Sequence, residues 1–217
     1  MFNQQSRILI VDDHPLVRAG LRSLIDAEPD LTICAEVSNV RDAVEVARAE
    51  APDLVLVDIS LDDGNGIELI KRLKVHNPDL KMLVCSMHDE SLFAERAINA
   101  GARGYVNKHQ VTEQVLEAIR QVLAGRIYLS EKMVERVING FAKKKDGGAS
   151  SIEDLSDREL EVFGLIGQGM STSKIAERLH LSVKTVESHR EKIKRKLGLA
   201  TSGELVRHAV QWHMEQS

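Results

Sequence analysis

The stretch "RILIVDDHP", Arg7–Pro15, determines how the N-terminal half of the chain is interpreted. Its apolar residues 8–11 have the character of a buried strand, and Pro15 suits the first turn of a helix, where its missing N–H is not needed. Between them stand Asp12 and Asp13, whose repulsion is costly near a buried strand unless a cation neutralises it. The stretch therefore indicates a strand, an acidic turn and a helix. The acids form part of a cation site or, alternatively, an ordinary helix cap with one spare carboxylate.

The sequence that follows alternates between strand-like and helix-like segments. Further apolar, β-rich runs occupy residues 31–37, 54–57, 81–86 and 104–106. Between these runs, apolar side chains recur with helical spacing, as at Leu21, Leu24 and Ile25. Five strands alternating with five helices predict an α/β fold, in which helices cover both faces of a parallel sheet and the crossovers are right-handed.

The composition is that of a soluble globular protein. The 217 residues suit one large or two small domains, and 43% are hydrophobic and 29% charged. No apolar run approaches the roughly 20 residues that span a bilayer, and the N-terminus lacks the basic start and apolar stretch of a signal peptide. We therefore expect a cytoplasmic protein with no membrane partner. Cys34 and Cys85 stand alone in apolar runs, which favours buried free thiols over a disulfide or metal site.

The chain changes character after about residue 126. Residues 130–142 could form a short helix, whereas 143–151, "KKKDGGASS", is charged, rich in Gly and Ser and without an apolar face. Such a composition is typical of a flexible linker. We predict a first domain at 1–126, a linker with a short helix at 127–152, and a second domain at 153–217.

The second predicted domain is small and all helical. Ser156 and Glu159 have the spacing of a capping box before a helix that Gly169 ends. Further helices are expected at about 172–179, 183–197 and 202–214. Ser182 is the expected N-cap of the helix at 183–197. The short "HLS" turn that precedes this helix is typical of a helix-turn-helix.

Polar side chains stand at the carboxyl ends of several predicted strands. These are Asp12 and Asp13 after the first strand, Asp58 after the third, Ser86 at the end of the fourth, and Lys108 just beyond the fifth. Ligands of open parallel sheets bind at this edge. Hard carboxylate oxygens suit Mg²⁺, and a central carboxylate such as Asp58 can attack phosphorus. Lys108 can pair with phosphoryl oxygens, and Ser86 can donate a hydrogen bond to one. Alternatively, Asp58 caps a turn and Lys108 is a surface charge.

Four motifs of residues 7 to about 125 resemble the receiver domain of response regulators. "VDDHP", "VDIS…GNG", "CSMH" and "GARGYVNK" occur in the order of that family. The resemblance implies a doubly wound, five-stranded parallel sheet of strand order 2-1-3-4-5. It also implies that a sensor histidine kinase phosphorylates Asp58.

The resemblance further implies a ligand set for the cation. Mg²⁺ would be held by Asp13, Asp58 and the Ser60 carbonyl, with Asp12 bound through water or just outside the ligands. Two histidines near the same edge are expected to be structural or solvent-facing rather than catalytic: His14 and His88.

The same resemblance assigns a switch pair, Ser86 and Tyr105. Three positions depart from the common receiver pattern: Asp62 and His109 stand where many receivers have proline, and Met87 stands where a small residue is usual. A methionine there predicts narrower access to the phosphorylation site.

The charge of the C-terminal part is unevenly distributed. Residues 150–217 carry ten basic and ten acidic side chains, whereas 184–196 alone holds six basic against two acidic ones. A local positive excess suggests a polyanionic partner, and a solvated helix face is the alternative.

A helix over 183–197 separates its apolar and polar residues. The inward side is predicted to hold Val183, Val186, Ile193 and Leu197, and the outward side Lys184, Ser188, Glu191, Lys192 and Arg195. Such a helix can lie in the major groove of double-stranded DNA. Five further residues are candidates for contact with, or attraction to, the DNA backbone: Ser182, Thr185, His189, Lys194 and Lys196. Glu191 either accepts a hydrogen bond from a cytosine or pairs with a neighbouring basic side chain.

The stretch "LSDREL…GQGMSTSKIAERLHLSVKTVESHREKIKRKLGL" resembles the LuxR-type helix-turn-helix over nearly all of 153–213. Together the two halves resemble a NarL/FixJ-type response regulator. This resemblance implies that phosphorylation of Asp58 controls homodimerisation and sequence-specific binding to promoter DNA, with RNA polymerase as a further candidate partner. A small phosphotransferase or aspartyl phosphatase using Asp58 is the alternative, and an adaptor without DNA binding is a third. No independent catalytic acid or base accompanies Asp58, so we expect a regulator and not an enzyme.

Overall fold

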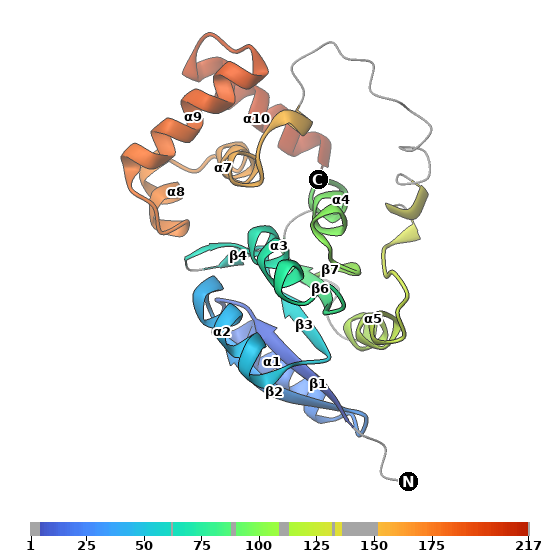
Figure 1. Cartoon of the computed structure of the whole chain (residues 1–217). Helices are drawn as coiled ribbons and strands as arrows, with labels where there is room; N and C mark the ends of the chain where they lie inside the picture. The colour runs from blue at the N-terminus through green and yellow to red at the C-terminus, as the bar shows by residue number, and fades with distance from the viewer. Residues whose placement is uncertain are drawn as a thin grey trace. The chain divides into compact units, whose positions relative to one another are not determined.

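The computed structural model of the chain describes residues 5–61, 63–87, 90–108, 113–131, 133–135 and 152–216 (Figure 1). The chain forms two compact units, one comprising residues 1–144 and the other residues 145–217. Several sequence predictions lie outside the described residues, namely those for Asp62, His88 and His109, most of the helix at 130–142 and the linker at 143–151. Among the described residues, none of the helices combines the length and apolar character needed to cross a membrane.

The first unit is built on five parallel strands in the order β2-β1-β3-β6-β7. Their bounds are β1 Ser6–Val11, β2 Leu31–Val37, β3 Leu54–Val57, β6 Lys81–Ser86 and β7 Gly104–Asn107. The predicted order 2-1-3-4-5 is confirmed, with β6 and β7 as the fourth and fifth strands of this sheet. The central strand β3 is entirely buried, because helices cover both faces of the sheet.

Four helices connect the strands and a fifth follows β7: α1 Pro15–Asp26, α2 Val40–Glu50, α3 Gly66–His76, α4 Glu90–Ala100 and, after β7, α5 Glu113–Leu123. On one face, Leu21 and Ile25 of α1 and Ile119 of α5 share a buried cluster with alternate strand residues such as Ile8 and Leu56. The remaining helices follow one another on the opposite side, α2 beside α3 and α3 beside α4. Doubly wound sheets have this arrangement because each right-handed crossover returns to one face or the other.

A short hairpin that the sequence did not predict joins β3 to α3. It pairs β4, Ser60–Leu61, with β5, Gly64–Asn65. The turn folds tightly against the end of β3, where the Gly66 N–H donates to the Ile59 carbonyl over 2.7 Å. A Cβ atom on Gly66 would lie 1.9 Å from the Asp58 carbonyl oxygen. Only glycine therefore permits this close approach, which holds the Asp58 backbone in place.

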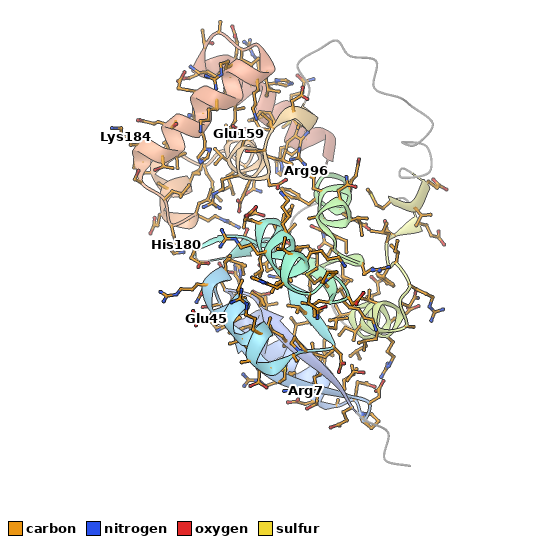
Figure 2. The ribbon with its side chains drawn as sticks, in the orientation of Figure 1. Arg7, Glu45, Arg96, Glu159, His180 and Lys184 are labelled. Atoms are coloured by element: carbon orange, nitrogen blue, oxygen red, sulfur yellow. The ribbon has the colours of Figure 1, made fainter. Side chains whose placement is uncertain are left out.

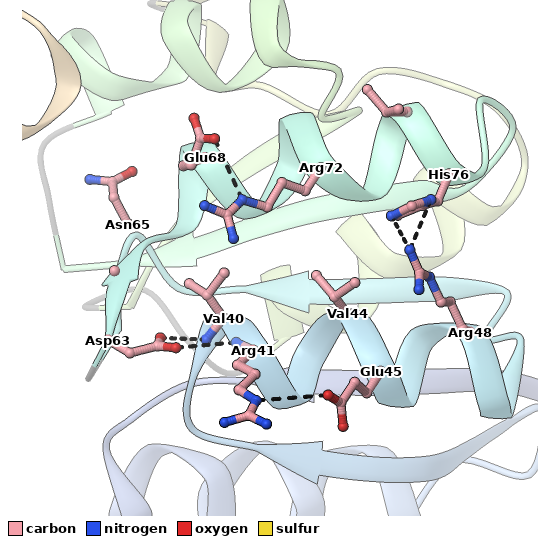
Figure 3. A pocket seen from close by; sticks show the side chains of 12 residues that line it. Val40, Arg41, Val44, Glu45, Arg48, Asp63, Asn65, Glu68, Arg72 and His76 are labelled. Carbon is pink, nitrogen blue, oxygen red and sulfur yellow. Dashed lines mark hydrogen bonds and ion pairs between the residues drawn. The ribbon is translucent and has the colours of Figure 1, made fainter.

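A groove of about 530 Å³ lies between α2 and α3 (Figure 3). Val40 and Val44 supply part of its apolar side, and Asp63 closes one end by accepting hydrogen bonds from the backbone N–H groups of Val40 and Arg41. None of the predicted site residues at the strand ends lines this groove. The groove is therefore separate from the polar edge of the sheet.

Beyond α5 the chain returns to the edge of the sheet. Tyr128 forms a parallel bridge with Gly104, in which the Tyr105 N–H donates to the Tyr128 carbonyl and the Tyr128 N–H to the Arg103 carbonyl, each over 3.0 Å. The Ser130 N–H donates to the Glu90 carboxylate at the start of α4 over 2.9 Å. Part of the predicted linker 127–152 thus covers the outer edge of β7.

Within residues 152–216, the second unit contains a 3₁₀ turn and four helices: η2 Ile152–Asp154, α7 Asp157–Gly167, α8 Thr172–Arg178, α9 Val183–Leu197 and α10 Ser202–Gln216. The predicted helices are confirmed, and so is the capping box of Ser156 and Glu159. Gly169 follows α7 with a φ of 78°, a left-handed conformation that suits glycine. The Ser182 hydroxyl caps α9 by accepting from the Thr185 N–H over 3.0 Å.

An apolar core holds these helices together. Phe163 of α7 packs against Trp212 of α10 with ring centroids 5.3 Å apart. Val186 and Ile193 of α9 are fully buried, as is Leu205 of α10. This core places α8 and α9 as a helix-turn-helix, and α9 exposes one side.

Both cysteines are free thiols, as the sequence predicted. Burial raises the pKa of the Cys85 thiol to about 12. Cys34 was expected to be buried but is partly exposed. It lies in β2, which forms one edge of the sheet, and an edge strand is less completely covered than a central one.

Candidate functional site

An acidic cluster occupies the carboxyl end of the sheet. Asp12 and Asp13 follow β1, and Asp58 follows the neighbouring strand β3, so the parallel strands bring them together. Asp12 and Asp58 are almost completely buried. Ligand atoms of Asp12, Asp13, His14 and Asp58 all lie within 4.8 Å of one another. The three predicted carboxylates therefore converge on one small volume.

Lys108 supplies a cation to this cluster. Its ammonium lies 2.6 Å from Asp58 Oδ2 and 2.7 Å from Asp12 Oδ2. Burial alone would lower the pKa of Lys108, but Asp58 and Asp12 outweigh it and the pKa is raised. Burial, with the nearby Asp58 charge, raises the pKa of Asp12. Lys108 supplies one positive charge beside three carboxyl groups, so the site suits a further cation.

The backbone and Lys108 orient the Asp58 carboxylate. Its Oδ1 accepts a hydrogen bond from the Ile59 N–H over 2.7 Å, while Oδ2 is directed to Lys108. The Asp58 N–H itself donates to the Val11 carbonyl over 2.8 Å. The carboxylate is thus held at the centre of the strand ends.

His14 belongs to the same cluster, although the sequence predicted only a structural or solvent-facing role. Its Nδ1 lies 2.5 Å from Asp13 Oδ1 and 3.8 Å from Asp58 Oδ2, and its side chain is half exposed. Its backbone N–H donates to Asp12 Oδ1 over 2.9 Å. The only signal in the sequence was its position directly after the acid pair.

The predicted switch residues are both buried. Ser86 ends β6 and is inaccessible to solvent, and Tyr105 lies in the adjacent strand β7 with 1% of its surface exposed. Met87, which follows Ser86, is half exposed at the surface. Ser60 lies in β4, two residues after Asp58, and is partly exposed. The tyrosine side chain therefore occupies an interior position.

The outward side of α9 is exposed as predicted. The exposed residues include Lys184, Ser188, Glu191, Lys192 and Arg195, together with the N-cap Ser182. Lys184 lies at the margin of the unit, whereas Glu159 of α7 lies within it (Figure 2). Glu191 pairs with Lys194 over 2.9 Å, which is the second of the two roles considered for it.

Four other residues of this region lie neither fully inward nor fully outward as the helical period predicts. Val183 was placed inward but is 44% exposed, because it is the first residue of α9 and precedes the packed part of the helix. Thr185 is partly buried and its hydroxyl lies 2.7 Å from that of Ser182. His189 is partly buried, and burial lowers its pKa, with Lys192 and Arg158 adding to the effect. Lys196 bonds to Glu159 over 2.6 Å instead of extending outward.

Family comparisons match both halves of the chain. Residues 8–120 match the response regulator receiver domain, and residues 153–209 match the bacterial regulatory proteins of the luxR family. The chain belongs to the LuxR-type, NarL/FixJ response regulators. Its two matched regions are those that carry the acidic cluster and the helix-turn-helix.

Curated relatives span nearly the whole response regulator. The oxygen regulatory protein NreC of Staphylococcus carnosus is 33% identical over 209 residues, covering 94% of this chain and 96% of the relative. The virulence-factor transcription regulator BvgA of Bordetella pertussis is 36% identical over 201 residues, covering 93% and 95%. Both relatives are named as regulators, BvgA as a transcription regulator, in keeping with the family of this response regulator.

Solved structures share the fold. A LuxR-family two-component response regulator from Aurantimonas is 34% identical, with a TM-score of 0.60 over 64% of this chain and all of that one. RcsB of Salmonella enterica, bound to promoter rprA in the presence of beryllofluoride, has a TM-score of 0.64. The alignment covers 95% of this response regulator and 99% of RcsB at 22% identity, which supports a common fold.

Proposed function

We propose that Asp58 is the phosphoacceptor of this response regulator and that a sensor histidine kinase supplies the phosphoryl group. The observation that carries the proposal is the 2.6 Å contact between Lys108 and Asp58 Oδ2 inside the acidic cluster. A buried carboxylate beside an ammonium and two further acids is suited to phosphoryl transfer, which depends on positioning and charge neutralisation.

The acidic cluster fits Mg²⁺. Three carboxylates gather within a few ångströms, and hard oxygen donors are the ligands that Mg²⁺ prefers. Asp13, Asp58 and the Ser60 carbonyl would hold the ion, with Asp12 beside it. When bound, the ion would offset negative charge on the transferring phosphoryl group.

Asp58, Lys108 and Ser86 have different roles in the proposed phosphoryl transfer. An Asp58 carboxylate oxygen forms the new bond to phosphorus as the bond from phosphorus to the kinase histidine breaks. Lys108 pairs with a phosphoryl oxygen, and the Ser86 hydroxyl donates to another. Ser86 ends β6, and Tyr105 lies in the neighbouring strand β7. Movement of Ser86 toward the phosphoryl group would therefore alter the surroundings of the buried Tyr105 ring.

The partners follow from the two halves. The second unit would bind double-stranded promoter DNA through the exposed side of α9, hereafter the reading face: Ser182, Lys184, Ser188, Glu191, Lys192 and Arg195. Phosphorylation would favour a homodimer. In a dimer, two linked helix-turn-helix units bind two half-sites together, which raises the overall affinity without changing the contacts that each unit makes. RNA polymerase is a further partner at the promoter. A regulator that contacts bacterial promoters works in the cytoplasm. The proposed boundaries are 1–126, 127–152 and 153–217, and the start of the 127–152 segment pairs with the edge of the first domain through Tyr128.

Beryllofluoride, which imitates the phosphoryl group on Asp58, tests this function. We expect the untreated chain to be mainly monomeric, with its reading face partly masked. Beryllofluoride and Mg²⁺ should increase both the molar mass in light scattering and the affinity for a duplex selected by the chain from random sequences. If beryllofluoride binds and neither quantity changes, the proposed control by phosphorylation is wrong.

Replacing Lys192 or Arg195 with alanine should weaken DNA binding, because both side chains lie on the exposed side of α9. Loss of a base contact costs roughly 1–3 kcal/mol and relaxes specificity at one position. Loss of a phosphate contact lowers affinity for every sequence and reduces the salt slope by about 1. Fluorescence anisotropy with selected and scrambled duplexes separates these results. Unchanged affinity in both variants would contradict the proposed reading face.

A further inference from the structure

Two buried acids of α7 are engaged by charged groups around the helix-turn-helix. Glu159 is 4% exposed and Glu161 is 2% exposed, although α7 carries none of the proposed reading face. Arg158 bonds to Glu161 over 2.8 Å and donates to the Leu179 carbonyl at the end of α8 over 2.8 Å. This contact fixes the first helix of the helix-turn-helix on α7.

Glu159 makes the corresponding contact with the reading helix. Its Oε2 lies 2.6 Å from Lys196 Nζ, and Lys196 also donates to the Asp154 carbonyl over 3.0 Å. The same carboxylate accepts from the Ser156 N–H over 2.8 Å. Burial opposes ionisation of Glu159, but hydrogen bonds from Lys196 and Ser156 outweigh it and lower the pKa. The last turn of α9 is therefore attached to the start of α7 by a charged pair.

The contacts of Lys196 differ from those of its neighbours on α9. An ammonium has three donors, and two of those on Lys196 are used within the unit. Lys192 and Arg195, in contrast, are exposed. Lys196, whose side chain is 35% exposed, thus directs two of its three donors to groups within the unit.

We infer that Glu159 and Lys196 are positioning residues that set the angle of α9 for base recognition. We call this pair the Glu159–Lys196 clamp. The inference rests on the proposed reading face, although neither residue belongs to that face. It goes beyond DNA binding as such, because it assigns part of the sequence specificity to a carboxylate on a helix that does not enter the groove.

The direction in which Glu159→Gln changes the affinity for DNA tests the inference. Glu159→Gln removes a negative charge, so an electrostatic effect alone would strengthen DNA binding. The clamp predicts the opposite: affinity for the selected duplex falls about tenfold, equivalent to the loss of one base contact. Affinity for a scrambled duplex should change little, because phosphate contacts remain. A fall in folded fraction would lower both affinities equally, which circular dichroism would also reveal.

Lys196 variants supply the second measurement. We expect Lys196→Met to lower specific affinity as much as Glu159→Gln while leaving the salt slope unchanged, and Lys196→Arg to retain specific affinity. The double variant should be no worse than either single one, because both remove the same interaction. Lys192→Met is the matched control from the same helix, and its salt slope should fall by about 1.

These results distinguish failure of the clamp from failure of the reading face. If Lys196→Met lowers the salt slope by about 1 and Glu159→Gln leaves affinity equal or higher, Lys196 is a phosphate contact and the clamp is wrong. If Lys192→Met has no effect on slope or affinity, the proposed reading face is wrong instead. If Glu159→Gln does not fold, the comparison of Lys196→Met with Lys196→Arg decides.

Discussion

Replacing Asp58 with asparagine should abolish phosphorylation of the chain. The other acids of the cluster, Asp12 and Asp13, remain, but Asp58 is the carboxylate whose two oxygens are held by Lys108 and by the Ile59 N–H. An amide at this position lacks the nucleophilic oxygen and cannot form the acyl phosphate. Intact-protein mass spectrometry after treatment with acetyl phosphate and Mg²⁺ should show one added phosphoryl group on the original chain and none on the variant.

The matched control is Asp79→Asn, which changes an exposed acid in the turn before β6. This variant should accept one phosphoryl group at the original rate. Full labelling of Asp58→Asn would show that another acid is the acceptor. In that case the positions of Asp12 and Asp13 in the same cluster would make them the next variants to examine.

Replacing Gly66 with alanine should both destabilise the first unit and slow phosphorylation. The added Cβ would overlap the Asp58 carbonyl oxygen, and the atoms that it would meet all belong to the backbone of Asp58 and Ile59, which limits relaxation. Overpacking of this kind lowers the free energy of unfolding by about 1–3 kcal/mol, and we expect the upper end because the contact is with backbone. Urea unfolding followed by circular dichroism measures the loss, and acetyl phosphate labelling measures the rate.

Gly20→Ala is the control for this substitution. Gly20 is exposed in α1, and a Cβ there would meet nothing within 4 Å. Alanine in a helix interior is favoured over glycine by roughly 0.5–1 kcal/mol, so this variant should be slightly more stable. Equal stability of the Gly66→Ala variant and the original chain would show that the β4–β5 turn relaxes freely and does not hold Asp58.

The parts of the fold that depend on continuous apolar runs could be predicted from the sequence. The bounds of β3 and β6 agree with the runs at 54–57 and 81–86, because burial on both faces favours continuous apolar residues. The bounds of β2 agree with the run at 31–37, although this edge strand is only partly buried. The β4–β5 hairpin could not be found in this way, since two-residue strands have no period to detect. The Tyr128 bridge was missed for the same reason.

The part of the candidate site that lies at the carboxyl ends of the strands could be predicted from the sequence. Asp12, Asp58 and Lys108 converge because parallel strands place their carboxyl ends together. The sequence placed His14 near this edge, but adjacency to two acids does not tell which way an imidazole points, so its contact with Asp13 could not be predicted. The helical period placed Lys196 near the basic side of α9, but a period describes one helix alone. The carboxylate on α7 that binds it becomes visible only when the helices pack together.

The Tyr128 bridge determines where the first unit can be separated from the rest of the chain. A receiver cut after Arg126 would leave the Arg103 carbonyl and the Tyr105 N–H without their hydrogen-bond partners along β7. Such an uncovered strand edge is a template for pairing with another molecule. Dimers formed by that truncated receiver would then reflect sheet extension instead of signalling. A receiver that ends at Glu135 keeps the bridge, and any change in its oligomeric state on phosphorylation would then reflect the proposed signalling.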